Sequence, residues 1–131
     1  MVAAPILDDA DIPDTAELWR RINPDWWVWD EKISGRRLSS QVYENSKDGS
    51  GTSVILSSES SIEQVMGGYD RYGLALLTAG AARAAQQGVR RVPVENVPGH
   101  AQIEGRKSGS AKNKLVAAST IVVVPFARQP D

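Results

Sequence analysis

His100 is the only histidine in this chain of 131 residues. Imidazole is the one side chain whose ordinary pKa lies near neutrality, so general acid–base catalysis with an unshifted group would have to use it. The residue follows Pro98 and Gly99 at the start of a predicted strand, where a side chain can face a cleft. The alternative interpretation is a histidine on the rim of the fold that only hydrogen-bonds locally.

Basic residues close to the histidine in sequence predict a site for an anion. Arg106, Lys107 and Ser108 precede a predicted helix, and helix N-termini attract anions. The run GHAQIEGRKS is not a phosphate-binding loop, because five residues instead of four separate its glycines and Arg106 stands before the lysine. Arg36 and Arg37 form a second basic pair that could converge on the same ligand. The alternative is a set of solvated charges on mobile connections.

Three of the four tryptophans, Trp26, Trp27 and Trp29, lie within four residues of one another. One interpretation is a lid that closes one end of the core. The other is an interaction surface for a planar ligand or a partner protein, because exposed tryptophans are strong anchors.

Bulk properties exclude several classes of function. The chain has no cysteine, a net charge of −1 and a pI of about 5.8. Thiolate catalysis, Fe–S clusters and cysteine-based zinc sites are therefore excluded, and the charge balance argues against a nucleic-acid partner. No nucleophile-elbow motif is present, and the acidic N-terminal segment reads as solvated rather than metal-binding. We expect no metal, no cofactor, no membrane span and a cytoplasmic location.

The elements that must position these residues are organised around the stretch 71–88, RYGLALLTAGAARAAQQG, which predicts a buried helix because it is apolar on most of its circumference. Capping-box spacings predict helices at 14–23 and within 57–68, and composition predicts a fourth at 111–119. Strands are predicted at 38–44, 52–56, 89–95, 100–104 and 120–126. The last contains five consecutive β-branched residues, which indicate the middle of a sheet.

Together these elements predict a single two-layer α+β domain over 14–126, with four helices packed on a four- or five-stranded, mainly antiparallel sheet. A flexible N-terminal tail over 1–13 and a polar C-terminal tail over 127–131 are expected to flank it.

Four short pieces resemble, in this order, a group of small uncharacterised bacterial proteins. They are LWRRI at 18–22, LSSQVY at 38–43, TSV at 52–54 and PGHA at 98–101, the last followed by Gly105 and Lys107. The similarity covers roughly residues 18 to 118. No activity is known for that group, so the resemblance implies nothing about mechanism, cofactor or partner.

These observations favour a small intracellular interaction or ligand-binding accessory protein without an autonomous catalytic constellation. Its partner would be a protein or a small anionic ligand. The alternative is a small enzyme that uses His100 as general acid or base on a phosphate- or carboxylate-bearing substrate. A third hypothesis is a homodimer that buries the tryptophan segment against a second copy.

Overall fold

The computed structural model describes residues 6–47 and 50–126 of the chain. The strands are β1 (Glu17–Ile22), β2 (Trp27–Asp30), β3 (Gly35–Leu38), β4 (Thr52–Leu56), β5 (Gly73–Thr78), β6 (Gly88–Arg91), β7 (His100–Glu104) and β8 (Thr120–Val123). The helices are α1 (Ile62–Met66), α2 (Ala79–Ala84) and α3 (Gly109–Ala118), and two 3₁₀ turns are η1 (Pro24–Trp26) and η2 (Ser40–Tyr43).

The main sheet has six strands in the order β6-β7-β4-β1-β5-β8, with every neighbouring pair antiparallel, while β2 and β3 form a separate hairpin. The α+β class is therefore confirmed. The finer prediction is wrong: the described residues contain three α-helices instead of four, and six strands instead of four or five in the sheet.

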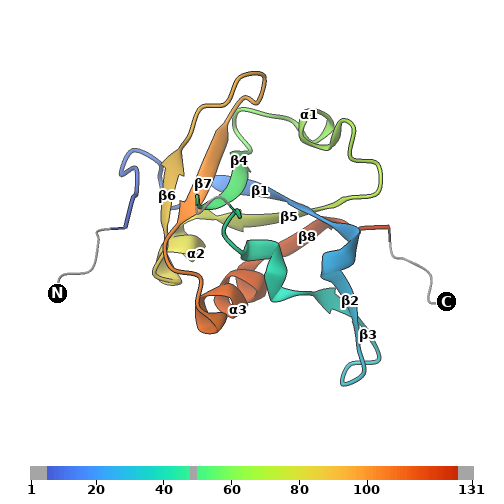
Figure 1. Cartoon of the computed structure of the whole chain (residues 1–131). Coiled ribbons are helices and arrows are strands. Elements are labelled where there is room, and N and C mark those ends of the chain that lie inside the picture. Colours follow the sequence, from blue (N-terminus) through green and yellow to red (C-terminus); the bar gives the residue numbers. More distant parts are fainter. Residues whose placement is uncertain (1–5, 48–49, 127–131) are drawn as a thin grey trace.

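Two apolar clusters lie on the two faces of the sheet. The larger one joins side chains of β1, β4, β5 and β7 to α2, α3 and η2, and the smaller one joins Ile55 and Leu74 to Val65 of α1. Figure 1 shows α2 and α3 together on one side of the sheet and α1 apart from them. We call the first side the α2/α3 face and the other the α1 face.

The stretch 71–88 is buried as predicted, but it is not one helix. Its first half is β5 and its second half is α2, with Thr78 capping the helix by accepting a hydrogen bond from the Ala81 amide. In β5, Leu74 enters the smaller cluster while Ala75 and Leu77 enter the larger one. A strand buried on both faces carries a continuous apolar run, which sequence periodicity does not distinguish from a buried helix.

The predicted helix at 14–23 is also a strand. Asp14 does not cap a helix, because its carboxylate pairs with Arg83 at 2.7 Å. Leu18 and Ile22 of β1 are fully buried in the larger cluster, and Trp19 between them packs on the smaller one. Side chains that alternate between two packed faces are what a central strand requires.

Two predicted strands occupy other positions. The segment 38–44 is mostly η2, which begins after Ser39 caps the Gln41 amide. β8 lies at the edge of the sheet instead of the middle, and its Val122 is 41% exposed. β-branched residues favour a strand, but topology decides whether that strand is central.

The opposite edge strand, β6, is covered by the segment that precedes β1. The Asp8 carboxylate accepts a hydrogen bond from the Val89 amide at 2.8 Å, and the Asp9 carboxylate accepts one from the Arg91 amide at 2.8 Å. Ile12 of the same segment is 1% exposed. Residues 1–5 of the predicted N-terminal tail, and the predicted C-terminal tail 127–131, lie outside the described residues. None of the described helices has the length and apolar character that crossing a membrane requires.

Candidate functional site

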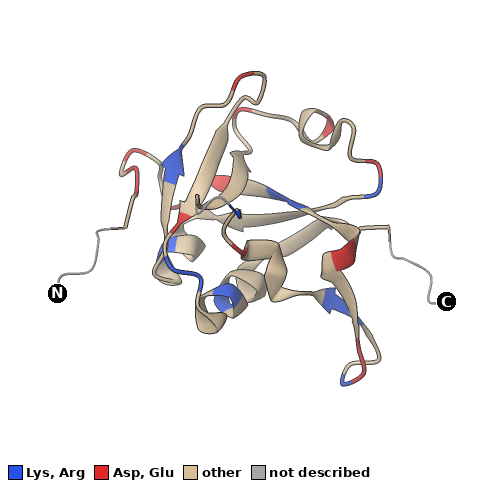
Figure 2. Ribbon diagram, in the orientation of Figure 1, with Lys and Arg blue, Asp and Glu red and all other residues tan. Residues whose placement is uncertain are grey.

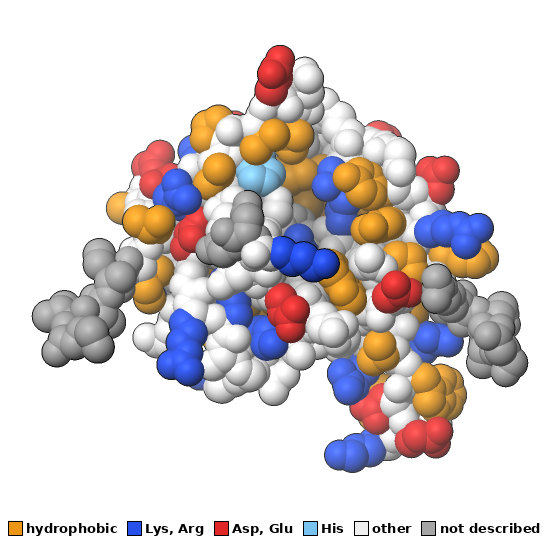
Figure 3. Space-filling model, viewed as in Figure 1, with side chains coloured by type: hydrophobic (Ala, Val, Ile, Leu, Met, Phe, Trp, Pro, Cys, Tyr) orange, Lys and Arg blue, Asp and Glu red, His pale blue; other side chains and the backbone are white. Residues whose placement is uncertain are grey.

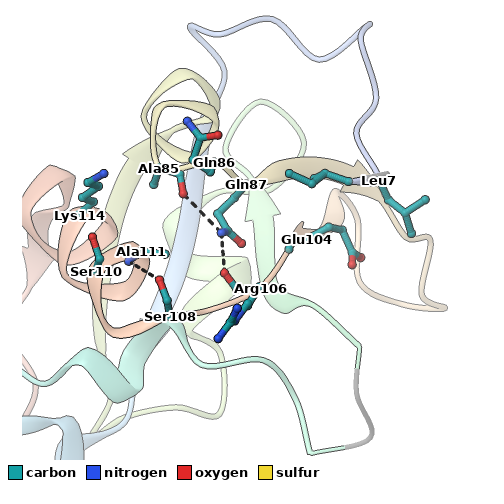
Figure 4. Close-up of a pocket in the computed structure, with 12 residues that line it drawn as sticks. Leu7, Ala85, Gln86, Gln87, Glu104, Arg106, Ser108, Ser110, Ala111 and Lys114 are labelled. Carbon is teal, nitrogen blue, oxygen red and sulfur yellow. Dashed lines mark hydrogen bonds between the residues drawn. The ribbon is translucent and has the colours of Figure 1, made fainter. Parts of the chain in front are cut away.

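A cleft with a volume of about 590 Å³ lies where β7 leads into α3 (Figure 4). We call it the α3 cleft. The end of α2, the connection after β7 and the first turns of α3 form its walls, and Leu7 lies across its mouth. Its lining residues are Ile6, Leu7, Ala85, Gln86, Gln87, Glu104, Gly105, Arg106, Ser108, Ser110, Ala111 and Lys114.

The first turn of α3 borders this cleft, which Ser108 and Ser110 line and Gly109 adjoins in the chain. Ser108 caps the helix, and its side chain accepts a hydrogen bond from the Ala111 amide at 3.1 Å. Within the described ranges, the amides of Gly109 and Ser110 have no hydrogen-bond partner. Open amides at a helix N-terminus carry partial positive charge and suit an anionic group.

Gln87 supplies the second unusual feature of the α3 cleft. Its side-chain amide donates to the Arg106 carbonyl at 2.9 Å and the Ala85 carbonyl at 3.4 Å, which fixes the orientation of the carboxamide. Gln87 is only 4% exposed, and its Oε1 accepts no hydrogen bond from any described residue. A buried acceptor without a donor costs about 1–3 kcal/mol. The oxygen is buried, so a ligand donor would reach it only if the Gln87 side chain turned towards the cleft.

The charges around the α3 cleft are unequal. Arg106 and Lys114 line it, and Figure 2 shows Lys and Arg positions in blue on α3 and on the connection before it. Glu104 also lines it, but its carboxylate pairs with Arg90 at 3.1 Å. Among residues 6–47 and 50–126, Arg106 and Lys114 form no ion pair while Glu104 does, and this balance favours an anion.

The predicted anion site at Arg106, Lys107 and Ser108 is divided by the structure. Arg106 and Ser108 line the α3 cleft, while Lys107 turns away. Its Nζ donates to Asn45 Oδ1 at 2.8 Å, the Ile103 carbonyl at 2.9 Å and the Gly105 carbonyl at 3.2 Å. Burial lowers the pKa of Lys107 to about 8, against the smaller opposing effect of Glu104. Lys107 therefore ties the loop at Asn45 to the end of β7.

The predicted ligand-binding residues Arg36 and Arg37 lie on β3, and neither lines the α3 cleft. An Arg36 Nη1 donates to the Trp27 carbonyl at 3.0 Å, and Arg37 pairs with Asp30 at 2.8 Å. The two arginines thus bridge the strands of the β2–β3 hairpin.

The tryptophan segment is split between two environments. Trp26 and Trp27 are half-buried and pack against the larger apolar cluster, where the Arg20 guanidinium stacks over the Trp26 ring at 5.2 Å. Trp29 is 55% exposed on the hairpin. Two of the three tryptophans therefore cover the core, and one remains available for contact.

His100 begins β7, whereas the α3 cleft lies at its other end. A strand of five residues separates its first and last Cα atoms by about 14 Å. The structure therefore does not bring His100 together with Arg106 or Ser108. His100 instead lines a second hollow of about 330 Å³ with Val94, Val97 and Pro98, which we call the His100 groove. Figure 3 shows the histidine, in pale blue, at the surface among hydrophobic side chains.

Both ring nitrogens of His100 have partners. Nδ1 lies 2.6 Å from the Val92 carbonyl oxygen, and Nε2 lies 2.6 Å from Ser53 Oγ. A carbonyl only accepts, so Nδ1 carries the proton in the neutral ring, and Nε2 accepts from the Ser53 hydroxyl. The arrangement holds the imidazole in one tautomer.

Three residues of the candidate sites were not predicted from the sequence, namely Ser53, Gln87 and Lys114. Ser53 and His100 lie in the predicted strands 52–56 and 100–104, but no sequence signal pairs β4 with β7. Gln87 lies at the end of the stretch 71–88, which was predicted to be one helix. Lys114 lies on α3 one turn after Ser110, which helical spacing could have shown.

No protein-family model, curated protein or solved structure matches the chain. The described residues contain no group of histidine and acidic side chains that could hold a metal ion. The geometry of the two hollows is therefore the basis for assigning a function.

Proposed function

We propose that the protein binds a small anionic ligand in the α3 cleft and acts as an accessory component of a larger cytoplasmic system. The observation that carries the proposal is the coincidence of two kinds of unsatisfied group at one cleft. The Gly109 and Ser110 amides lack acceptors among the described residues, and Gln87 Oε1 lacks a donor there.

The anionic group would lie at the first turn of α3. Two backbone amides donate to it there, and Arg106 and Lys114 supply positive charge from either side. Charge-assisted hydrogen bonds are shorter and roughly twice as strong as neutral ones, so this end of the cleft would dominate the affinity.

The body of the ligand would be apolar and would carry one hydrogen-bond donor. Leu7, Ala85 and Ala111 supply the apolar lining, and Gln87 Oε1 is the acceptor for the donor. A volume of about 590 Å³ fits a small organic molecule. A phosphate or carboxylate ester of an aromatic or aliphatic body has this chemistry.

Isothermal titration calorimetry with phenyl phosphate tests the proposal. Binding is expected for the wild-type chain, and the double change Arg106→Gln and Lys114→Gln is expected to weaken it by about 10-fold or more. Lys112→Gln is the matched control, because Lys112 lies on α3 but pairs with Glu44 at 3.2 Å outside the cleft. Equal affinity in all three proteins, or no binding, would contradict the proposal.

A further inference from the structure

The contact between Ser53 and His100 is a diagonal pair across two strands of the main sheet. β4 and β7 are antiparallel with Ser53 opposite Gln102 and Ile55 opposite His100. Val54 and Ala101 belong to the larger cluster, so Ser53 and His100 both project from the α1 face. Diagonal neighbours on one face of a sheet are close enough for such a contact.

The positions of the protons decide which atom donates the hydrogen bond between Ser53 and His100. Because Nδ1 donates to Val92, Nε2 is the basic nitrogen, and the hydroxyl proton of Ser53 points at it from 2.6 Å. A serine hydroxyl bound to a basic imidazole nitrogen, with the other nitrogen fixed by an acceptor, is the arrangement that activates serine as a nucleophile. The Val92 carbonyl fills the orienting position that a carboxylate often occupies.

The backbone at Ser53 is fixed as well. The carbonyl of Ser53 accepts a hydrogen bond from Arg20 Nη1 at 2.9 Å, and the same guanidinium donates to the Val42 carbonyl at 2.7 Å. Arg20 is a positioning residue, because it reaches Ser53 only through the main chain.

A cation stands on the other side of Ser53. In the β1–β4 register, Leu18 faces Leu56 and Trp19 faces Ile55, so the next same-face position brings Arg21 opposite Ser53. Both residues line one small hollow of about 30 Å³. Arg21 Nε donates to the Val65 carbonyl at 2.6 Å and the guanidinium stacks over the Tyr69 ring at 4.0 Å, while its Nη atoms have no hydrogen-bond partner in residues 6–47 and 50–126. The positive charge of Arg21 lies on the same face of the sheet as Ser53 and suits a negative charge that develops there.

The space next to the pair is lined by polar as well as apolar residues, with Glu59 and Arg91 beside His100 and Ser60 and Gln64 beside Arg21. The His100 groove shares Asn96, Val97 and Pro98 with a neighbouring hollow of about 440 Å³, which continues to Arg21 and Ile55. One continuous surface thus runs from His100 past Val97 to the cation. Of these three hollows, Ser53 lines only the small one of about 30 Å³, and an acyl chain on this surface would have to place its carbonyl at that hollow.

We infer that Ser53 is a nucleophile that accepts short aliphatic acyl groups from esters, with His100 as its general base. Ser53 Oγ attacks the ester carbonyl carbon while its proton passes to His100 Nε2, and the Arg21 guanidinium faces the oxyanion. The carbon–oxygen bond to the leaving group then breaks, and that group takes the proton from Nε2. Water, deprotonated by the same nitrogen, hydrolyses the acyl-serine and releases the acid. This activity is independent of the ligand proposed for the α3 cleft.

Intact-protein and peptide mass spectrometry after mixing with para-nitrophenyl butyrate tests the inference. A single butyryl group is expected on the peptide that contains Ser53, together with release of para-nitrophenolate. Ser53→Ala is expected to abolish the adduct. His100→Gln is expected to slow its formation by about 100-fold or more, the usual contribution of a general base.

Ser58→Ala is the matched control, because Ser58 is an exposed serine and is expected to leave acylation unchanged. Ser53→Cys keeps a nucleophile beside the imidazole and is expected to retain acylation. Thermal unfolding of each variant shows whether it is folded, and the mapped site in the wild type requires no variant. An adduct on His100 or on lysines, release that persists in Ser53→Ala, or a wild type that gives neither an adduct nor release of para-nitrophenolate would overturn the inference.

Discussion

Gly105 lies so close to Gln87 that a β-carbon at position 105 would stand 2.6 Å from Gln87 Oε1. Gly105 also has a φ of +135°, which side chains rarely tolerate. The change Gly105→Ala is therefore expected to lower the free energy of unfolding by about 1–3 kcal/mol, measured by urea denaturation. Gly109→Ala is the control, because a β-carbon there meets nothing within 4 Å. Equal free energies of unfolding for the two variants would show that the connection between β7 and α3 accepts a side chain at position 105 without strain.

The Asp8 carboxylate is expected to protect the β6 edge. Its Oδ1 accepts hydrogen bonds from the Val89 amide at 2.8 Å and from Arg83 Nε at 3.1 Å. Asp8→Ala should lower the free energy of unfolding by about 1–3 kcal/mol and accelerate hydrogen exchange at Val89. Asp11→Ala is the control, because Asp11 makes neither contact. Unchanged exchange at Val89 in Asp8→Ala would refute the role given to Asp8.

The difference between prediction and structure has a physical cause in each element. The strands at 52–56 and 100–104 were predicted with the bounds that β4 and β7 have, because each is a short run bounded by turn residues, and 100–104 also alternates. The helix predicted from Asp14 failed because its cap signal is local, whereas the Asp14 carboxylate binds Arg83, 69 residues away. Long-range partners of this kind leave no trace in the local pattern.

The same limit applies to the candidate site. Arg106 and Ser108 could be predicted, because a basic pair before a helix start is a local feature. The Ser53–His100 contact could not, because it depends on the pairing of β4 with β7, 47 residues apart. Sequence reasoning identified the histidine but not the serine that binds it.

Lys107 is expected to make stability rise with pH in the alkaline range. Burial lowers its pKa from 10.5 to about 8, so between these values the unfolded chain binds more protons than the folded chain. The free energy of unfolding then increases as pH rises from about 8 towards 10.5. Lys107→Met removes this titration. Denaturation of both proteins across that range should show the free energy of unfolding of the wild type increasing relative to that of the variant. A constant difference would count against the lowered pKa of Lys107.

Tyr43 is expected to have the opposite effect at higher pH. Its hydroxyl lies 2.5 Å from Ser119 Oγ, and burial raises its pKa from 10 to about 12. Between these values the folded chain keeps a proton that the unfolded chain loses, so the free energy of unfolding falls as pH rises. Relative to Tyr43→Phe, the wild type should lose stability above pH 10. If the free energies of unfolding of the two proteins changed in parallel with pH, the raised pKa of Tyr43 would be disproved.

The most direct test of ligand binding in the α3 cleft is an amide NMR titration with phenyl phosphate. Saturable chemical-shift changes are expected that are largest at Gly109 and Ser110, together with a change at the Gln87 side-chain amide. Shifts scattered over surface lysines and arginines without saturation, or shifts absent from the first turn of α3, would contradict it.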